Sequence, residues 1–183
     1  MKATLARYAR SQGGYTLVEL IIASALGLFV MTGLTSVVLT TWRAGTTATS
    51  RIEASSQIRN FEFEAYDDFA LSNLPTPSGC SATAADPCTT PIVLQGVQAS
   101  NATIPVTSAY QVTYMWDGVN QLRRQVQVGN GLPINFDAAT GVTAFSWYLD
   151  GSGSHQMVVV TISVTVQSYT ETQTLRFYPR VNP

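Results

Sequence analysis

Charged residues are scarce in this chain: they make up 11% of its 183 residues, against roughly a quarter in an average globular protein. Acidic and basic residues nearly balance, at 11 and 10. A protein that binds nucleic acid needs a clustered excess of Lys and Arg. The adjacent pair Arg123 and Arg124 is a small patch, which we expect at the solvated edge of a strand. No nucleic-acid partner is therefore predicted.

Residues with catalytic or metal-binding chemistry are also rare. The chain has one His, His155, which follows the Gly/Ser-rich residues 150–154. No nucleophile motif stands near it, so we expect an exposed loop residue without a catalytic role. The sequence has no phosphate-binding loop, no dinucleotide fingerprint and no His-Glu zinc motif. The prediction is a protein that is not an enzyme and that has no cofactor and no metal site.

Both charge and proline are missing from a long stretch near the N-terminus. Residues 20–42 contain no charged residue, and no proline occurs before Pro75. As a helix, the uncharged run would span roughly 34 Å, enough to cross a bilayer core. A short leader before it contains Lys2, Arg7 and Arg10 and no acid. Because positive charge stays on the cytoplasmic side, we expect the N-terminus in the cytoplasm and the bulk of the chain outside.

A glycine pair, an apolar start and one acid stand in register ahead of the uncharged run. The stretch is Gly13-Gly14-Tyr15-Thr16-Leu17-Val18-Glu19-Leu20, and it resembles the class III signals of type IV pilins and of the pseudopilins of type II secretion. In that family a membrane peptidase cuts after the glycine and methylates the new N-terminal amine. The resemblance implies a cut between Gly14 and Tyr15, with Tyr15 methylated in place of the usual Phe. It also implies that Glu19 pairs with the N-terminal amine of a neighbouring subunit.

Three other interpretations of the uncharged run stay open. An ordinary secretory signal has an apolar core of roughly 7–15 residues followed by its cut, and Ala44, Gly45 and Ala48 make only a loose cleavage pattern. A plain membrane anchor explains the length of the run but not the occurrence of Gly14 close to Glu19. A buried helix of a soluble protein is disfavoured by the length.

The chain stays compatible with a helix beyond the uncharged run, up to Pro75. Apolar residues recur there at steps of three and four, which puts them on one helical face: Ile58, Phe61, Ala65 and Phe69. We expect this face to pack against the rest of the protein. The charged residues of the segment should lie mostly elsewhere: Arg51, Glu53, Arg59, Glu62, Asp67 and Asp68.

The two cysteines, Cys80 and Cys88, lie in a loop of residues 75–91 that is rich in Pro, Ser, Thr and Ala. Outside the cytoplasm, such an even pair predicts a disulfide. A metal site would need more ligands, and a redox motif would need only two residues between the cysteines. Closing so short a loop stabilises a fold by about 2–3 kcal/mol in the chain-entropy model.

After Pro91 the hydrophobic period changes from that of a helix to that of strands. Strands are expected at residues 92–94, 110–116, 122–128, 142–149 and 157–166, with a return through Leu175 and Phe177. In residues 142–149, strict alternation would put Val142 on the face opposite Phe145 and Trp147. Hairpin-linked strands after one helix indicate an α+β fold, with a long N-terminal helix packed on an antiparallel β-sheet.

The sequence thus predicts four segments. These are a leader peptide at 1–14, a transmembrane or filament-core helix at 15–42, an amphipathic continuation of the helix at 43–74, and a β-rich extracytoplasmic domain at 75–183. This layout resembles that of pilins, most closely the larger minor pilins and the J-type minor pseudopilin. Some major pseudopilins bind calcium in an acidic C-terminal loop. Here Glu171 is the only acid after Asp150, so no such site is expected.

The resemblance implies a structural subunit of a type IV pilus or a type II secretion filament. Its partners would be prepilin peptidase, other pilins or pseudopilins, and the assembly platform of the inner membrane. It would cross that membrane once, with its C-terminal domain periplasmic or extracellular. Two alternatives stay open: a DNA-uptake (competence) pseudopilin, and a membrane-anchored extracytoplasmic binding domain or hydrolase.

Overall fold

The computed structural model describes residues 14–99, 107–151 and 156–179. One helix, α1 (Leu17–Leu71), is followed by seven strands: β1 (Ile92–Ala99), β2 (Thr107–Trp116), β3 (Gln121–Val128), β4 (Ile134–Thr140), β5 (Val142–Asp150), β6 (Met157–Val166) and β7 (Tyr169–Phe177). The prediction of an α+β fold with a long N-terminal helix is confirmed. The leader residues 1–13 and His155 lie outside the described residues.

The chain divides into two compact units, Met1–Gly45 and Thr46–Pro183. In the first unit, the described part of α1 has no proline, and its hydroxyl side chains bond back to the helix. Those of Thr32, Thr35, Thr40 and Thr41 donate to carbonyl oxygens three or four residues earlier, at 2.7–3.1 Å. Such bonds satisfy polar groups that would be costly to leave unpaired in an apolar environment.

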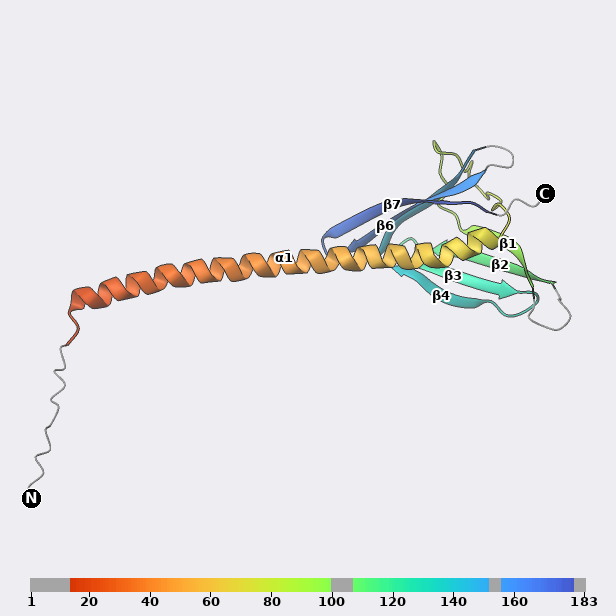
Figure 1. Cartoon of the computed structure of the whole chain (residues 1–183). Helices are drawn as coiled ribbons and strands as arrows, with labels where there is room; N and C mark the ends of the chain where they lie inside the picture. Colours follow the sequence, from red (N-terminus) through yellow and green to blue (C-terminus); the bar gives the residue numbers. More distant parts are fainter. Residues whose placement is uncertain (1–13, 100–106, 152–155, 180–183) are drawn as a thin grey trace, which may run out of the picture. The chain divides into compact units, whose positions relative to one another are not determined.

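The second unit contains the rest of α1 and all seven strands (Figure 1). The strands form two antiparallel sheets where the sequence predicted one. The first sheet has the order β1-β2-β3-β4, and the second has the order β5-β6-β7. Strand β4 was not predicted, because only Ala138 and Ala139 of its seven residues are buried and it shows no apolar alternation. It forms one edge of the first sheet, and most of its side chains are exposed on both faces.

The apolar stripe of α1 fills the space between the two sheets. Ile58, Phe61, Ala65 and Phe69 are all buried. The ring of Phe61 meets Tyr114 of β2 edge-on at 5.4 Å between centroids, and Phe145 of β5 in the same way at 6.0 Å. The side chain of Phe61 therefore contacts both sheets. Edge-to-face pairs of this kind stabilise a fold by about 0.5–1.5 kcal/mol each, in addition to the contribution from burying their apolar area.

Strand β5 departs from the expected alternation. Val142 is buried together with Phe145 and Trp147, although strict alternation would place it on the opposite face. The register shifts between Val142 and Ala144, which marks a β-bulge. A bulge inserts one extra residue and so moves the preceding side chain to the other face. The expected position of Val142 was therefore wrong for this reason.

Candidate functional site

The expected cleavage site lies in open chain just before the helix. Gly14, Tyr15 and Thr16 precede the first residue of α1, and Tyr15 is 88% exposed. A Cβ atom added to Gly14 would meet nothing within 4 Å. In the described part of the chain, the peptide bond between Gly14 and Tyr15 is therefore accessible to a peptidase. Any selection for glycine at this position has to come from the peptidase, because the fold of this chain does not require it.

Glu19 takes part in the first turn of α1. The backbone N–H of Thr16 donates to Glu19 Oε2 at 3.0 Å, and the Thr16 hydroxyl donates to the same oxygen at 3.1 Å. In return, the backbone N–H of Glu19 donates to Thr16 Oγ1 at 3.3 Å. This reciprocal pattern is a capping box, with Thr16 at the N-cap and Glu19 three residues on. The spacing of Thr16 and Glu19 could have revealed it in the sequence.

The capping box leaves half of the Glu19 carboxylate available. Both hydrogen bonds from Thr16 end on Oε2. Over the described ranges of the chain, no hydrogen bond reaches Oε1. A carboxylate has about four acceptor sites, so Glu19 can accept a further donor through Oε1 while it caps its own helix.

The first unit exposes its apolar side chains. Every residue of α1 up to Gly45 is exposed, and the helix is long and apolar enough to cross a membrane. Trp42, which is 72% exposed, stands where the uncharged run ends, directly before Arg43. Trp is enriched at the interface between lipid and water, and Arg beside it suits the polar side. The helix therefore has the composition of a membrane segment with an anchor at one end.

A second polar site, a buried cluster, ties α1 to the first sheet. Asp68 is 2% exposed. Its carboxylate accepts from Arg124 Nε and Nη2 at 2.6 and 2.7 Å. The hydroxyl groups of Tyr114 and Tyr110 donate to it at 2.6 and 2.8 Å. The bidentate pair with two added hydrogen bonds satisfies the buried charge.

This cluster corrects two expectations. Asp68 does not lie away from the buried face with the other charged residues of the segment. Arg124 does not lie at a solvated edge, because β3 is an inner strand and the side chain reaches the helix. The partners are 56 residues apart in sequence, so no local pattern could have shown that each neutralises the other.

Alkaline pH should weaken the second unit through this cluster. Burial, and after it the hydrogen bond to Asp68, raise the pKa of Tyr110 to about 12. Burial and the charge of Asp68 also raise the pKa of Tyr114. An unfolded Tyr has a pKa of about 10, so between pH of about 10 and 12 the unfolded chain binds fewer protons than the folded one, and stability falls as pH rises. Denaturant unfolding over this range should show that the free energy of unfolding falls less steeply with pH in Tyr110→Phe than in the wild type. An equally steep fall would mean that Tyr110 does not contribute to the pH dependence.

Cys80 and Cys88 are joined in a disulfide. The loop that they close is fixed to the edge strand β5: the backbones of Cys88 and Trp147 exchange hydrogen bonds at 2.8 and 2.9 Å. The indole N–H of Trp147 also donates to the carbonyl oxygen of Thr90 at 2.9 Å. The bridge thus holds a loop without secondary structure of its own against the core.

We predict the same bridge in the native compartment. Protein alkylated without reductant should carry no label on Cys80 or Cys88, whereas reduced and unfolded protein should carry two. Mass spectrometry distinguishes the two states. Two labelled thiols without reductant would place this part of the chain in a reducing compartment and would contradict the predicted topology.

Comparison with known proteins identifies the N-terminal segment. The family described as "prokaryotic N-terminal methylation motif" matches residues 9–35. Searches of curated proteins and of solved structures found no match. The match includes Gly14, Tyr15 and Glu19 and continues into the apolar part of α1. The chain thus carries a class III signal followed by a long apolar helix, and this combination is consistent with a type IV pilin-like protein.

Proposed function

We propose that this chain is a minor pilin or pseudopilin, a structural subunit of a type IV pilus or of a type II secretion filament. One observation carries the proposal. The methylation motif covers residues 9–35 and includes the start of the exposed apolar helix α1, whose first turn is closed by the Thr16–Glu19 capping box. The function of such a chain is assembly rather than catalysis. In the proposal, residues 1–14 are removed and residues 15–42 serve first as membrane anchor and then as filament core.

The location follows from the same helix. An N-terminal apolar helix of this length is consistent with a single pass through the inner membrane. The basic leader would stay in the cytoplasm and the β-rich residues 75–183 would lie outside. Processing by prepilin peptidase follows from the class III signal. Other pilins or pseudopilins and an inner-membrane platform complete the proposed set of partners.

Glu19 would set the position of each subunit in the filament. After cleavage, Tyr15 bears a cationic amine, and Glu19 lies four residues on, roughly 6 Å along a helix axis. An unpaired charge in a dry helix bundle costs about 3 kcal/mol on insertion scales, so each needs an opposite partner. Glu19 Oε1 can accept the amine of an adjacent subunit while Oε2 keeps its bonds to Thr16. The pairing would fix the axial register of the incoming subunit.

Replacement of the glycine tests the processing step. Gly14→Val should leave the precursor uncut, because a branched side chain would crowd the peptidase site. It should not disturb the fold, since a Cβ at this position has open space around it. Immunoblotting of membranes should show the larger, uncut precursor. Sheared filaments should not contain this precursor. Normal cleavage of this variant, or filaments that contain the uncut chain at the wild-type level, would contradict the proposal.

A further inference from the structure

Carboxamide side chains form a row across the outer face of the first sheet. Leu94 of β1 and Val112 of β2 are buried in the core, so their neighbours in sequence point away from it, because side chains alternate between the two faces of a strand. The register places three glutamines directly opposite one another on β1, β2 and β3: Gln95, Gln111 and Gln127. Directly opposite residues share a face. One kind of side chain is therefore repeated across three strands.

The chain after α1 adds a fourth member to this row. Asn73 donates its backbone N–H to the carbonyl oxygen of Gln95 at 2.8 Å, and Ser72 forms a β-bridge with Gly96. A Cβ atom on Gly96 would lie 2.5 Å from the carbonyl oxygen of Leu71, so this close approach requires glycine. Strands lie about 4.8 Å apart, which makes a row over four segments about 14 Å long. We call these four residues the amide row: Asn73, Gln95, Gln111 and Gln127.

A hollow of about 380 Å³ lies along the amide row. All four carboxamide residues line it, together with Ala109 and Gly129. The backbone N–H of Gly129 donates to the carbonyl oxygen of Ala109 at 2.7 Å, so these two residues stand side by side next to the amide row. Because neither has a bulky side chain, space is left beside the glutamines.

The polar groups of the amide row are available and uncharged. In the part of the chain that the structure describes, no hydrogen bond engages any of its four side chains. In the neighbouring row, by contrast, the carboxamide of Gln125 donates to Asn135 Oδ1 at 3.0 Å. Among the described strand residues of this face, the charged ones are Arg123 and Asp137, which are opposite each other and have opposite charges. They lie two rows away from the amide row.

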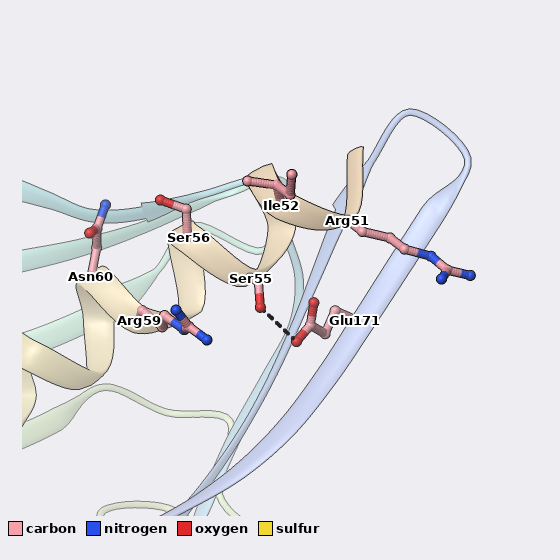
Figure 2. Close-up of a pocket in the computed structure, with 7 residues that line it drawn as sticks. All are labelled: Arg51, Ile52, Ser55, Ser56, Arg59, Asn60 and Glu171. Atoms are coloured by element: carbon pink, nitrogen blue, oxygen red, sulfur yellow. Dashed lines mark hydrogen bonds between the residues drawn. The ribbon is translucent and has the colours of Figure 1, made fainter. Parts of the chain in front are cut away.

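The larger hollow beside α1 has a different chemistry. This groove of about 590 Å³ is lined by charged side chains, among them Arg51, Arg59 and Glu171. Figure 2 shows the hydrogen bond from the Ser55 hydroxyl to the Glu171 carboxylate. The groove also contains an exposed carboxamide, Asn60. Asn60 is therefore a carboxamide in a charged setting, which can be compared with the amide row.

We propose that the amide row binds a neutral, linear glycan of the cellulose type, laid across the strands. A carboxamide both donates and accepts hydrogen bonds, as does each hydroxyl group of a sugar. A charged ligand would lose water without meeting an opposite charge in the row, which is costly. The spacing of about 4.8 Å between strands is close to the length of one sugar unit in such a chain, so each unit can meet one carboxamide. The C–H groups of the rings would pack on Ala109, which lines the same hollow.

Purified full-length protein tests this binding, because the binding does not depend on filament assembly. The detergent should have no sugar headgroup, since such a headgroup would compete for the site. The probes are insoluble cellulose and insoluble chitin, which share one backbone and differ in the acetamido group of chitin. Wild-type protein should be retained on at least one of the two polymers, and the matching soluble oligosaccharide should release it. The bound fraction is measured by immunoblotting.

Two variants should block the site in different ways. Gln111→Glu places a negative charge in the middle of the row, whereas Ala109→Ile fills the hollow with an uncharged side chain that suits a strand. Each should lower the bound fraction about tenfold, because hydrogen bonds to the glycan are lost. Asn60→Asp adds the same charge at the carboxamide beside α1 and should leave the bound fraction unchanged. Urea unfolding of all three variants should match that of the wild type, which separates lost binding from lost folding.

Three results would overturn the glycan proposal. The first is wild-type protein that neither polymer retains. The second is retention of both Gln111→Glu and Ala109→Ile at the wild-type level. The third is a loss in Asn60→Asp as large as that in Gln111→Glu, which would mean that net charge decides retention. A chain that binds a polymer as expected but never enters filaments would contradict only the filament function proposed above.

Discussion

Asp68→Ala is expected to lower the free energy of unfolding of the second unit by about 3 kcal/mol, because removing one partner of a buried pair leaves an uncompensated charge. The side chain of Asp68 is 3% exposed and that of Arg124 is 18% exposed. Water therefore reaches part of the guanidinium, which puts the estimate at the low end of the range for such losses. Two tyrosine hydroxyl groups also lose their acceptor.

The neighbouring acid supplies the matched control. Asp67 precedes Asp68 directly but is exposed, so Asp67→Ala should change the free energy of unfolding by less than about 0.5 kcal/mol. Urea unfolding of the detergent-solubilised chain, followed by tryptophan fluorescence, gives both values. Replacing Asp68 and Arg124 together by apolar residues of similar size should recover most of the loss. An equal loss in free energy of unfolding for Asp68→Ala and Asp67→Ala would mean that the buried cluster does not stabilise the second unit.

Glu19→Gln is expected to remove the subunit from filaments while leaving its cleavage and membrane insertion intact. Gln can occupy the third position of a capping box as Glu does, so this variant keeps the first turn of α1 and loses only the charge. An amine left without its counter-charge costs about 3 kcal/mol, which corresponds to on the order of a hundredfold less incorporation. Quantitative immunoblotting of sheared filaments measures the loss.

Thr16→Ala makes the converse change. It removes the capping hydroxyl, worth about 1 kcal/mol, and keeps the carboxylate of Glu19. We expect this variant to be incorporated near the wild-type level. If Glu19→Gln is instead recovered in filaments at the wild-type level, then Glu19 acts only as a helix cap and the pairing model is wrong. The two variants separate helix capping from subunit pairing. The capping bonds end on Glu19 Oε2, whereas the proposed pairing uses Oε1.

Local periodicity was sufficient to predict the helix and its buried stripe. Ile58, Phe61, Ala65 and Phe69 are in register over three turns, and nothing in the fold shifts them. The α+β class followed because hairpin-linked strands come after that single helix. The methylation motif was also visible, because its glycine, acid and uncharged run are contiguous in the chain. Features that are short-range in sequence were therefore accessible.

Features set by distant partners were not accessible. The burial of Asp68 depends on Arg124, which becomes close only when β3 packs beside α1. The face of Val142 depends on a bulge against β6. Strand β4 has too few buried residues to show a period of two. In each case, the burial or the strand depends on pairing between strands or between a strand and the helix. Residues that are neighbours in sequence do not determine that pairing.

The N-terminal residue of the subunit in its assembled form tests the central claim most directly. Filaments sheared from cells would be digested, and the N-terminal peptide of this chain would be sequenced by mass spectrometry. The proposed function predicts a peptide that begins at Tyr15 with a methylated amine, contiguous with Thr16 and Glu19. A peptide that begins at any other residue, or a chain that is found only in membranes and never in filaments, would contradict it.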